Sequence, residues 1–432
     1  DSALESPENS SWSNNKVKAA SSASLISLTL KATSKSEFFY SYGTGKTGKF
    51  WIDENETTGV VSVPSGEVVG NFRPAHYLTK FGNFNSYVWT ALPTIDFPKL
   101  QELDLSGQTS ILSTSLFSNG VYTSDGSGLK NIKVLNLSNV KVLKDASSTG
   151  TTTFSLDCSR CYKLEELILT NSSITSITYP ATSILRVLNL SGTNITSLEL
   201  KDQSLLESVD ISNCPNLTSI NINNCSSLQS ITIPNTVTSV TLTGCDSISS
   251  LTCTYSSNSL ISPLVSVVVN TCPGLKTVNL SGQNNPNLEL QLTGATNLET
   301  LNISGIKTSN ITLPSTSIWT SLKSLDISFT SLYSLTFGSE TSTYLNLIAF
   351  PNLSYINASN CTSLVKVVCT NDESNPIELS YGAFRNCTAL TSLYGHFSLE
   401  GTDIFRGCSA LKFENTYTDL GAFVSGDTAT NI

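Results

Sequence analysis

The chain has 432 residues, of which 13% are charged, and its formal net charge at pH 7 is −9. This acidic balance repels phosphate backbones and anionic lipids, so the composition disfavours nucleic-acid and membrane-surface partners. Hydrophobic residues make up 39%, enough for a core, and no apolar run reaches the ~18 residues of a spanning helix. Small hydroxyl side chains are abundant, with 70 Ser and 52 Thr. The sequence contains no Met and no signal peptide, and we expect that a cleaved leader preceded it.

The N-terminal quarter differs in pattern from the rest. Residues 1–16 are polar and predict a flexible leader. Residues 17–98 contain strand-like alternation between turn clusters and predict a small β-rich cap domain. The run GTGKTGK at 43–49 approaches the phosphate-loop spacing, but Phe50 stands where Ser or Thr should hold magnesium, and no helix pattern follows. This favours a glycine-rich hairpin turn over a nucleotide site.

From Leu206 onward, eleven-residue segments repeat. LESVDISNCPN, LTSININNCSS and LQSITIPNTVT follow one another in the form L-x-x-I-x-I-x-x-C/N. The central I-x-I predicts a short strand with one buried face, and eleven residues suffice only for a strand and a bend. Successive strands form two interleaved series, so one coil of about 22 residues carries two strands. We therefore predict a mainly β solenoid over residues 99–415, followed by a C-terminal cap and tail at 416–432.

The repeat resembles the leucine-rich repeat core L-x-x-L-x-L-x-x-N/C. Matching segments are LQELDLSG at 100–107, IKVLNLSN at 132–139, LRVLNLSG at 185–192 and LKSLDISF at 322–329. The segments AFRNCTALTSL at 383–393 and IFRGCSALKF at 404–413 are similar to the A-F-x-x-C-x-x-L variant of BspA-like surface proteins of Bacteroidetes. This resemblance implies a leucine-rich-repeat solenoid that acts in adhesion or capture of a protein or glycan ligand at a bacterial surface. It also implies an outward-facing outer-membrane location, a lipid anchor upstream as the one membrane contact, and a neighbouring uptake transporter complex.

The eleven cysteines follow the repeat rather than a metal or disulfide pattern. Three replace an inward aliphatic residue of a strand, and eight lie at the turn, where a thiol can accept a weak hydrogen bond from the backbone. Cys158 and Cys161 form a lone C-x-x-C, and no second pair completes a metal site. We expect buried structural thiols, and no metal or cofactor. The full set is Cys158, Cys161, Cys214, Cys225, Cys245, Cys253, Cys272, Cys361, Cys369, Cys387 and Cys408.

Catalytic constellations are absent from the sequence pattern. His76 and His396 are the only histidines, and neither lies in a recognisable motif. Paired carboxylates could serve a glycosidase, but the strand residues Glu199, Asp210, Glu289 and Asp326 are separated by coils. The sequence favours a binding protein without enzymatic activity. Two alternatives remain open: a phage fibre or decoration protein, and a carbohydrate-active enzyme on a β solenoid.

Candidate binding residues come from two patterns. In each strand, one outward residue lies between the inward pair, and we expect these residues to form rows. An aromatic cluster at 319–333 also concentrates large side chains, which either bind a ligand or cover the edge of the solenoid. In the second strand series, the outward residues are predicted to include Val268, Glu289 and Thr312. The predicted binding residues are Asn189, Asp210, Asn279, Asn302, Asp326, Trp319, Phe329 and Tyr333.

Overall fold

The computed structural model describes most of residues 23–411, and the structural statements below concern that part of the chain. Its regular structure is strand and turn, with no α-helix and no helix that could span a membrane among the described residues. The predicted leader at 1–16 and the predicted tail at 416–432 lie outside it, and the boundary at residue 99 stays a prediction. The described ranges are 23–32, 36–42, 46–52, 59–64, 69–72, 78–82, 99–107, 131–143, 151–256, 260–309, 311–314, 320–334, 336–337, 343–347, 350–369 and 374–411.

The chain divides into two compact units, Asp1–Thr196 with Leu205–Asn216, and Ser197–Ser204 with Leu217–Ile432. The first unit holds an eight-stranded sheet with the order β16-β14-β12-β8-β7-β6-β1-β4. Its strands from β6 to β16 run parallel, whereas β1 pairs antiparallel with both β6 and β4. The bounds are β1 (Ala23–Ala32), β4 (Gly59–Pro64), β6 (Leu78–Gly82), β7 (Glu102–Asp104), β8 (Val134–Asn136), β12 (Glu166–Ile168), β14 (Val187–Asn189) and β16 (Ser208–Asp210).

Three smaller sheets complete the first unit. Strands β2 and β3 pair antiparallel, beginning at Tyr42 and Lys46, which agrees with the predicted glycine-rich hairpin; residues 43–45 themselves lie outside the described part. Strand β5 extends this pair, β9 pairs with β10, and β11 runs parallel to β13. The bounds are β2 (Ser36–Tyr42), β3 (Lys46–Ile52), β5 (Val69–Phe72), β9 (Val142–Leu143), β10 (Thr151–Thr152), β11 (Phe154–Asp157) and β13 (Ile174–Thr178).

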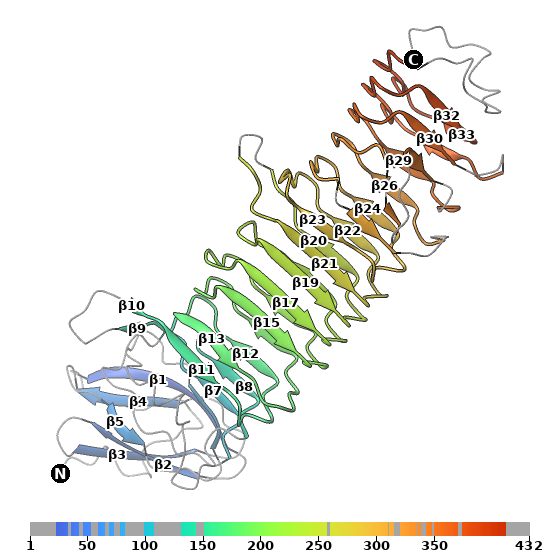
Figure 1. Cartoon of the computed structure of the whole chain (residues 1–432). Helices are drawn as coiled ribbons and strands as arrows, with labels where there is room; N and C mark the ends of the chain where they lie inside the picture. Colours follow the sequence, from blue (N-terminus) through green and yellow to red (C-terminus); the bar gives the residue numbers. More distant parts are fainter. Residues whose placement is uncertain are drawn as a thin grey trace. The chain divides into compact units, whose positions relative to one another are not determined.

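The second unit is a stack of coils with two long parallel sheets. The seven-stranded sheet is here called the β15–β27 sheet, and its strands β15, β17, β19, β21 and β23 lie side by side in Figure 1. The strands of this sheet are β15 (Ser197–Lys201), β17 (Ser219–Asn223), β19 (Ser239–Thr243), β21 (Ser266–Asn270), β23 (Glu289–Gln291), β25 (Ile311–Leu313) and β27 (Thr336–Phe337).

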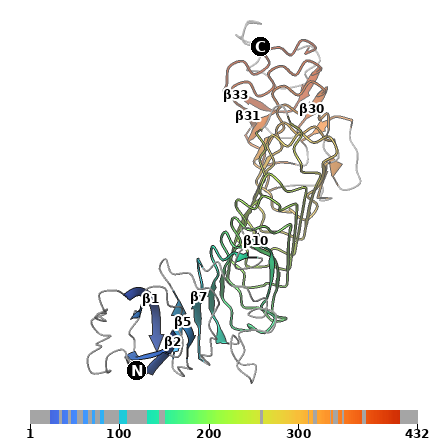
Figure 2. The same cartoon turned by 90° about the vertical axis from the view of Figure 1, so that its left-hand side faces the viewer.

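The eight-stranded sheet, here the β18–β33 sheet, is built from strands that alternate along the chain with those of the β15–β27 sheet as far as β27, and beyond it with those of a third sheet. Its strands are β18 (Ser230–Thr232), β20 (Ser250–Thr252), β22 (Thr277–Asn279), β24 (Thr300–Asn302), β26 (Ser324–Asp326), β29 (Tyr355–Asn357), β31 (Ile377–Leu379) and β33 (Phe397–Leu399). A separate parallel sheet contains β28 (Leu345–Asn346), β30 (Lys366–Val368) and β32 (Ser392–Tyr394). Figure 2 shows β31 and β33 next to each other and β30 on another side of the coils.

The strand register gives the coil length. Leu198 in β15 pairs with Ile220 in β17, 22 residues further along the chain. Within β17, Ile220 and Ile222 are at most 1% exposed, whereas Asn221 between them is exposed. The predicted leucine-rich-repeat solenoid, with about 22 residues and two short strands per coil, is therefore confirmed. Burial of each inward Leu or Ile contributes roughly 1.5–3 kcal/mol, and each coil relies on its neighbours for that burial.

One corner of the coil is formed by a recurring turn after the strand. In β24, the Asn302 side-chain oxygen accepts the backbone N–H of Ser304 at 3.0 Å. The next residue, Gly305, has φ +77°, a left-handed conformation that glycine adopts without steric cost. Asn360 occupies the equivalent position further along, with φ +61°. The repeated sequence L-N-L-S-G/N therefore forms a turn in which an Asn or Asp side-chain oxygen accepts a backbone N–H at the corner of the coil.

The register also corrects part of the second strand series. Val268 pairs with Gln291, and Gln291 pairs with Thr312, so Gln291 takes the row position predicted for Glu289. Glu289 pairs with Ser266, two residues earlier on the same face. The error arose because three apolar residues alternate in LELQL, so either flanking pair fits the inward pattern.

Candidate functional site

The structure brings the predicted row residues together within each unit. In the first unit, Asn189 of β14 pairs with Asp210 of β16. In the second unit, Asn279 pairs with Asn302, and Asn302 pairs with Asp326. Adjacent strands lie about 4.8 Å apart, so these side chains form short ladders.

These row side chains are half-buried, because the coil corners use them. The Asp326 Oδ1 atom accepts the Ser328 N–H at 3.0 Å and the Ser328 hydroxyl at 2.7 Å, and its Oδ2 accepts the Asn357 amide at 3.2 Å. Asp210 accepts the same two bonds from Ser212. The row side chains therefore stabilise the turns through these hydrogen bonds. A ligand could contact only those of their polar atoms that the turns do not use.

Two of the three predicted aromatics lie at the surface. Phe329 is 58% exposed and Tyr333 is 49% exposed, whereas Trp319 lies outside the described residues. Phe329 has φ +59° at the corner position that Gly305 and Asn360 occupy in the adjacent coils. A bulky residue in this conformation is strained, and strain of this kind is concentrated at functional sites. The Lys307 ammonium donates to the Phe329 carbonyl oxygen at 3.1 Å.

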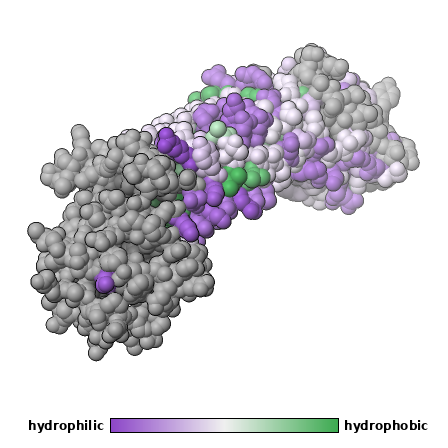
Figure 3. All heavy atoms as spheres, turned by 90° about the horizontal axis from the view of Figure 1, so that it is seen from below, coloured by the Kyte–Doolittle hydropathy of each residue, from purple (hydrophilic) through white to green (hydrophobic). Residues whose placement is uncertain are grey.

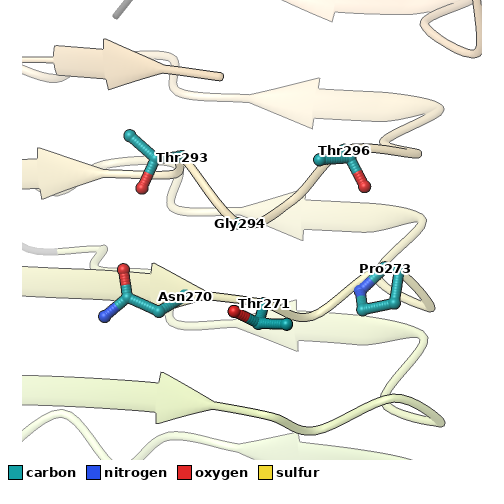
Figure 4. Close-up of a pocket in the computed structure, with 6 residues that line it drawn as sticks. All are labelled: Asn270, Thr271, Pro273, Thr293, Gly294 and Thr296. Atoms are coloured by element: carbon teal, nitrogen blue, oxygen red, sulfur yellow. The ribbon is translucent and has the colours of Figure 1, made fainter. Parts of the chain in front are cut away.

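A polar hollow that the sequence analysis did not predict lies between two neighbouring coils of the second unit. Its volume is about 320 Å³. Figure 4 shows Thr293 and Thr296 on either side of Gly294 in one coil, with further lining residues in the adjacent coil. The one sequence signal for this hollow is Thr271. The equivalent corners at 223–225 and 243–245 have the sequences N-N-C and T-G-C, with Asn or Gly where Thr271 stands. The lining residues are Asn270, Thr271, Pro273, Thr293, Gly294 and Thr296.

Charged side chains outside these features pair with one another across coils. Glu299 lies between Lys276 and Lys323, with N–O distances of 3.1 and 3.4 Å. The hydrogen bonds from these two lysines hold the pKa of Glu299 below its ordinary value. In the first unit, Arg186 pairs with Glu207 at 2.7 Å. The surface in Figure 3 is mostly hydrophilic or neutral over the described residues, and its hydrophobic spots are small.

A lysine on β30 lies between two tyrosine rings. The Lys366 ammonium is 4.7 Å from the centroid of the Tyr344 ring and 4.9 Å from that of Tyr394. This arrangement places a cation over two aromatic faces and connects β30 with Tyr394 of β32 and with Tyr344, the residue directly before β28.

The cysteines are free, and all but the half-buried Cys408 are buried. Burial raises the pKa of Cys225 and of Cys253 to about 11. At the corners, the thiol of Cys361 donates to the Ile327 carbonyl at 3.0 Å, and Cys387 donates in the same way to Ala358. The predicted acceptor role of these thiols is present as well, since backbone hydrogen bonds from Thr330 to Cys361 and from Cys361 to Cys387 counteract the rise of the two thiol pKa values that burial causes.

No group of three metal-ligating side chains occurs among the described residues. Within the second unit the carboxylates considered for catalysis lie apart, since β17, β19 and β21 separate Glu199 on β15 from Glu289 on β23, and Asp326 lies on β26 of the other sheet. His396 is half-buried, and His76 lies outside the described part of the chain.

Similar solved structures are leucine-rich repeat proteins, whereas no family model and no curated protein matches the sequence. One, from Bacteroides ovatus, is 14% identical, with 86% of this chain and 79% of that chain covered and a TM-score of 0.25. An internalin from Listeria monocytogenes is 14% identical, with 67% and 81% covered and a TM-score of 0.24. A leucine-rich repeat protein from Bacteroides thetaiotaomicron is 16% identical, with 70% and 37% covered and a TM-score of 0.29. These likenesses add no argument about what this chain binds.

Proposed function

We propose that this chain is a non-enzymatic leucine-rich repeat protein of a bacterial cell surface, which binds a protein or glycan ligand. In this proposal it is an adhesin or surface lipoprotein that faces outward from the outer membrane beside an uptake complex. The similarity of the C-terminal segments 383–393 and 404–413 to the BspA-like repeat motif supports this assignment. A repeat scaffold presents a long surface whose outward residues are free to vary while the inward residues keep the fold.

The observation that carries the proposal is the outward face of the β15–β27 sheet. Strands β17, β19 and β21 are paired in register there, and their outward side chains are uncharged. These side chains repeat every ~4.8 Å along the stack, which suits an extended ligand. In rows across the three strands they are Ser219, Ser239 and Ser266, then Asn221, Thr241 and Val268, then Asn223, Thr243 and Asn270.

The test is direct binding of the purified chain to immobilised extracellular proteins and polysaccharides, together with a reducing-sugar assay on the same polysaccharides. We expect saturable binding to at least one ligand and no release of reducing sugar. Release of sugar would identify a carbohydrate-active enzyme instead, and absence of saturable binding across both panels would contradict the proposal.

The exposed aromatic pair provides a variant for the protein-binding case. Aromatic side chains remove much apolar area from water at small entropic cost, so they often anchor protein partners. Replacing Phe329 and Tyr333 together by Ser should weaken binding of a protein ligand at least tenfold while the melting temperature holds. Tyr162→Ser is the matched control, since Tyr162 is 55% exposed in the other unit.

A further inference from the structure

The hollow between the two coils exists because the backbone at Gly294 leaves the regular stack. The Gly294 N–H donates to the Val269 carbonyl at 2.8 Å, and its carbonyl accepts the Cys272 N–H at 3.0 Å. A Cβ atom on Gly294 would collide with the backbone nitrogen of Thr271, so only glycine fits this approach. The chain therefore dips toward the coil below, and Thr293 and Thr296 remain on either side of the dip (Figure 4).

The lining of this hollow contains no ionisable side chain. It offers the Asn270 amide and the hydroxyls of Thr271, Thr293 and Thr296, while the Pro273 ring supplies an apolar surface. Three of these side chains are exposed threonines whose hydroxyls can both donate and accept hydrogen bonds. A charged ligand would find no counter-charge here, whereas a ligand rich in hydroxyl groups would find matching partners.

Backbone strain marks the same place. Thr271 has φ +53°, at the corner position that Asn224 and Gly244 occupy in the two preceding coils. Glycine and Asn tolerate this left-handed conformation, but a β-branched residue there is an outlier. Strained residues persist where the surrounding structure holds them, often at binding sites. Here the strain keeps a threonine hydroxyl at the hollow.

The hollow also continues a polar row of the β15–β27 sheet. Asn223, Thr243 and Asn270 are paired in register on β17, β19 and β21, and Asn270 lines the hollow. A linear ligand could therefore lie along the row and place one unit in the hollow. Its volume of about 320 Å³ is at the lower end of the ~300–1,000 Å³ of small-molecule sites and is large enough for a single sugar ring.

We propose that this hollow binds one sugar residue of an uncharged glycan, held by the Asn270 amide and the threonine hydroxyls and packed against the Pro273 ring. The inference rests on the proposed binding function and names the ligand class at one site. It assigns a role to Thr271, Thr293 and Thr296 that the strand pattern alone does not provide.

Isothermal titration calorimetry of the full chain against neutral polysaccharides (dextran, β-glucan, mannan and xylan), with heparin as a charged comparison, tests the proposal. We expect binding of a neutral polysaccharide that changes little between 50 and 500 mM salt. The Thr293→Val, Thr296→Val double variant keeps the shape of the hollow but removes two hydroxyls, and should weaken this binding about tenfold or more. The matched control is Thr362→Val, Thr388→Val, whose exposed threonines follow Cys361 and Cys387 at another corner.

Each outcome decides the assignment. Loss of affinity in the hollow variant with retention in the control supports it. Equal affinity in both variants, or no binding of any neutral polysaccharide by the unmodified chain, overturns it. Saturable binding to an extracellular protein in that last case would leave the proposed function standing, so the two failures can be told apart.

Discussion

Among single residues, the cysteines show most clearly how composition can mislead. An odd number of thiols in a chain expected at a cell surface suggests disulfides or a metal, yet their spacing follows the coil. The structure gives three corner thiols the same local role: Cys361, Cys387 and Cys408 donate to carbonyl groups of the preceding coil at 3.0 Å. A buried thiol with a raised pKa has little thiolate and reacts slowly.

Cys408 is the exception and should be the fast-reacting thiol. A hydrogen bond with a neighbouring thiol lowers the pKa of Cys408, as it does for Cys161 and Cys272, but only Cys408 is half-buried while the other ten thiols are buried. Titration with an aromatic disulfide reagent at pH 8 should show one fast thiol in the native chain, with the other ten reacting after unfolding. Cys408→Ser should remove the fast phase, whereas Cys361→Ser at a buried corner should retain it. Recovery of native disulfides by mass spectrometry would contradict this account of the thiols.

At the scale of the strand and its corner, the turn chemistry sets which residues can vary. The corners after β22, β24 and β29 of the β18–β33 sheet each contain a left-handed residue, which is Gly282, Gly305 or Asn360. Phe329 adopts the same left-handed conformation after β26, with φ +59°, although it is bulky and its side chain is 58% exposed. An exposed side chain gains little from burial, so the fold itself provides no compensation for the conformational cost.

Phe329→Asn should therefore stabilise the protein by about 1 kcal/mol, because asparagine adopts the left-handed conformation at lower cost. Urea unfolding measures the change. The complementary control is Gly305→Ala, which places a Cβ at φ +77° in the preceding coil and should destabilise the protein by about the same amount. Loss of stability in Phe329→Asn would show that apolar contacts of the ring outweigh the strain.

Ion pairs across the coils give the second unit a modest dependence on acid pH. A carboxyl whose pKa is lower in the folded state than in the unfolded state stabilises the fold above its ordinary pKa. That contribution is lost as the pH falls through the folded-state pKa. Glu299 fits this case, since Lys276 and Lys323 lower its pKa from 4.5.

The expected result is a small decrease in melting temperature for Glu299→Gln at pH 7 that is lost as the pH falls through the lowered pKa of Glu299 and that shrinks in 0.5 M salt. Thermal melts from pH 7 to pH 3 measure it. In a Lys276→Gln, Lys323→Gln background, the Glu299→Gln change should have no pH-dependent effect. The same pH dependence in both backgrounds would mean that other carboxylates cause it.

Sequence pattern predicted the strands well because the inward residues alternate with a strict period. Asn279, Asn302 and Asp326 were assigned to one row from spacing alone, and their pairing confirms that register. Glu289 was misplaced because LELQL offers two equivalent inward pairs. The hollow could not be predicted, since it depends on where the Gly294 backbone bonds across coils, at Val269 and Cys272. Such non-local contacts leave no periodic signal in the sequence.

For the molecule as a whole, the ends of a repeat stack need protection, because an open parallel sheet edge can pair with another chain. In the first unit, β6 pairs parallel with β7, and β1 pairs antiparallel with β6. The first coil strand, β7, is thus covered on its outer side by strands of the N-terminal region. Phe81 of β6 is 0% exposed and is among the largest fully buried side chains of the described residues.

Deleting residues 1–98 should therefore expose the edge of β7 and the apolar layer that Phe81 covers, and the shortened chain should self-associate. Size-exclusion chromatography with light scattering measures the change as a higher and concentration-dependent mass. Deletion of residues 1–22 is the control, since it removes no described strand and should leave the mass per particle as in the full chain. Phe81→Ala in the full chain should lower the stability by ~3–5 kcal/mol without opening the edge, which separates loss of packing from loss of the cover. Equal mass for both deletions would show that β7 does not depend on the N-terminal strands for protection.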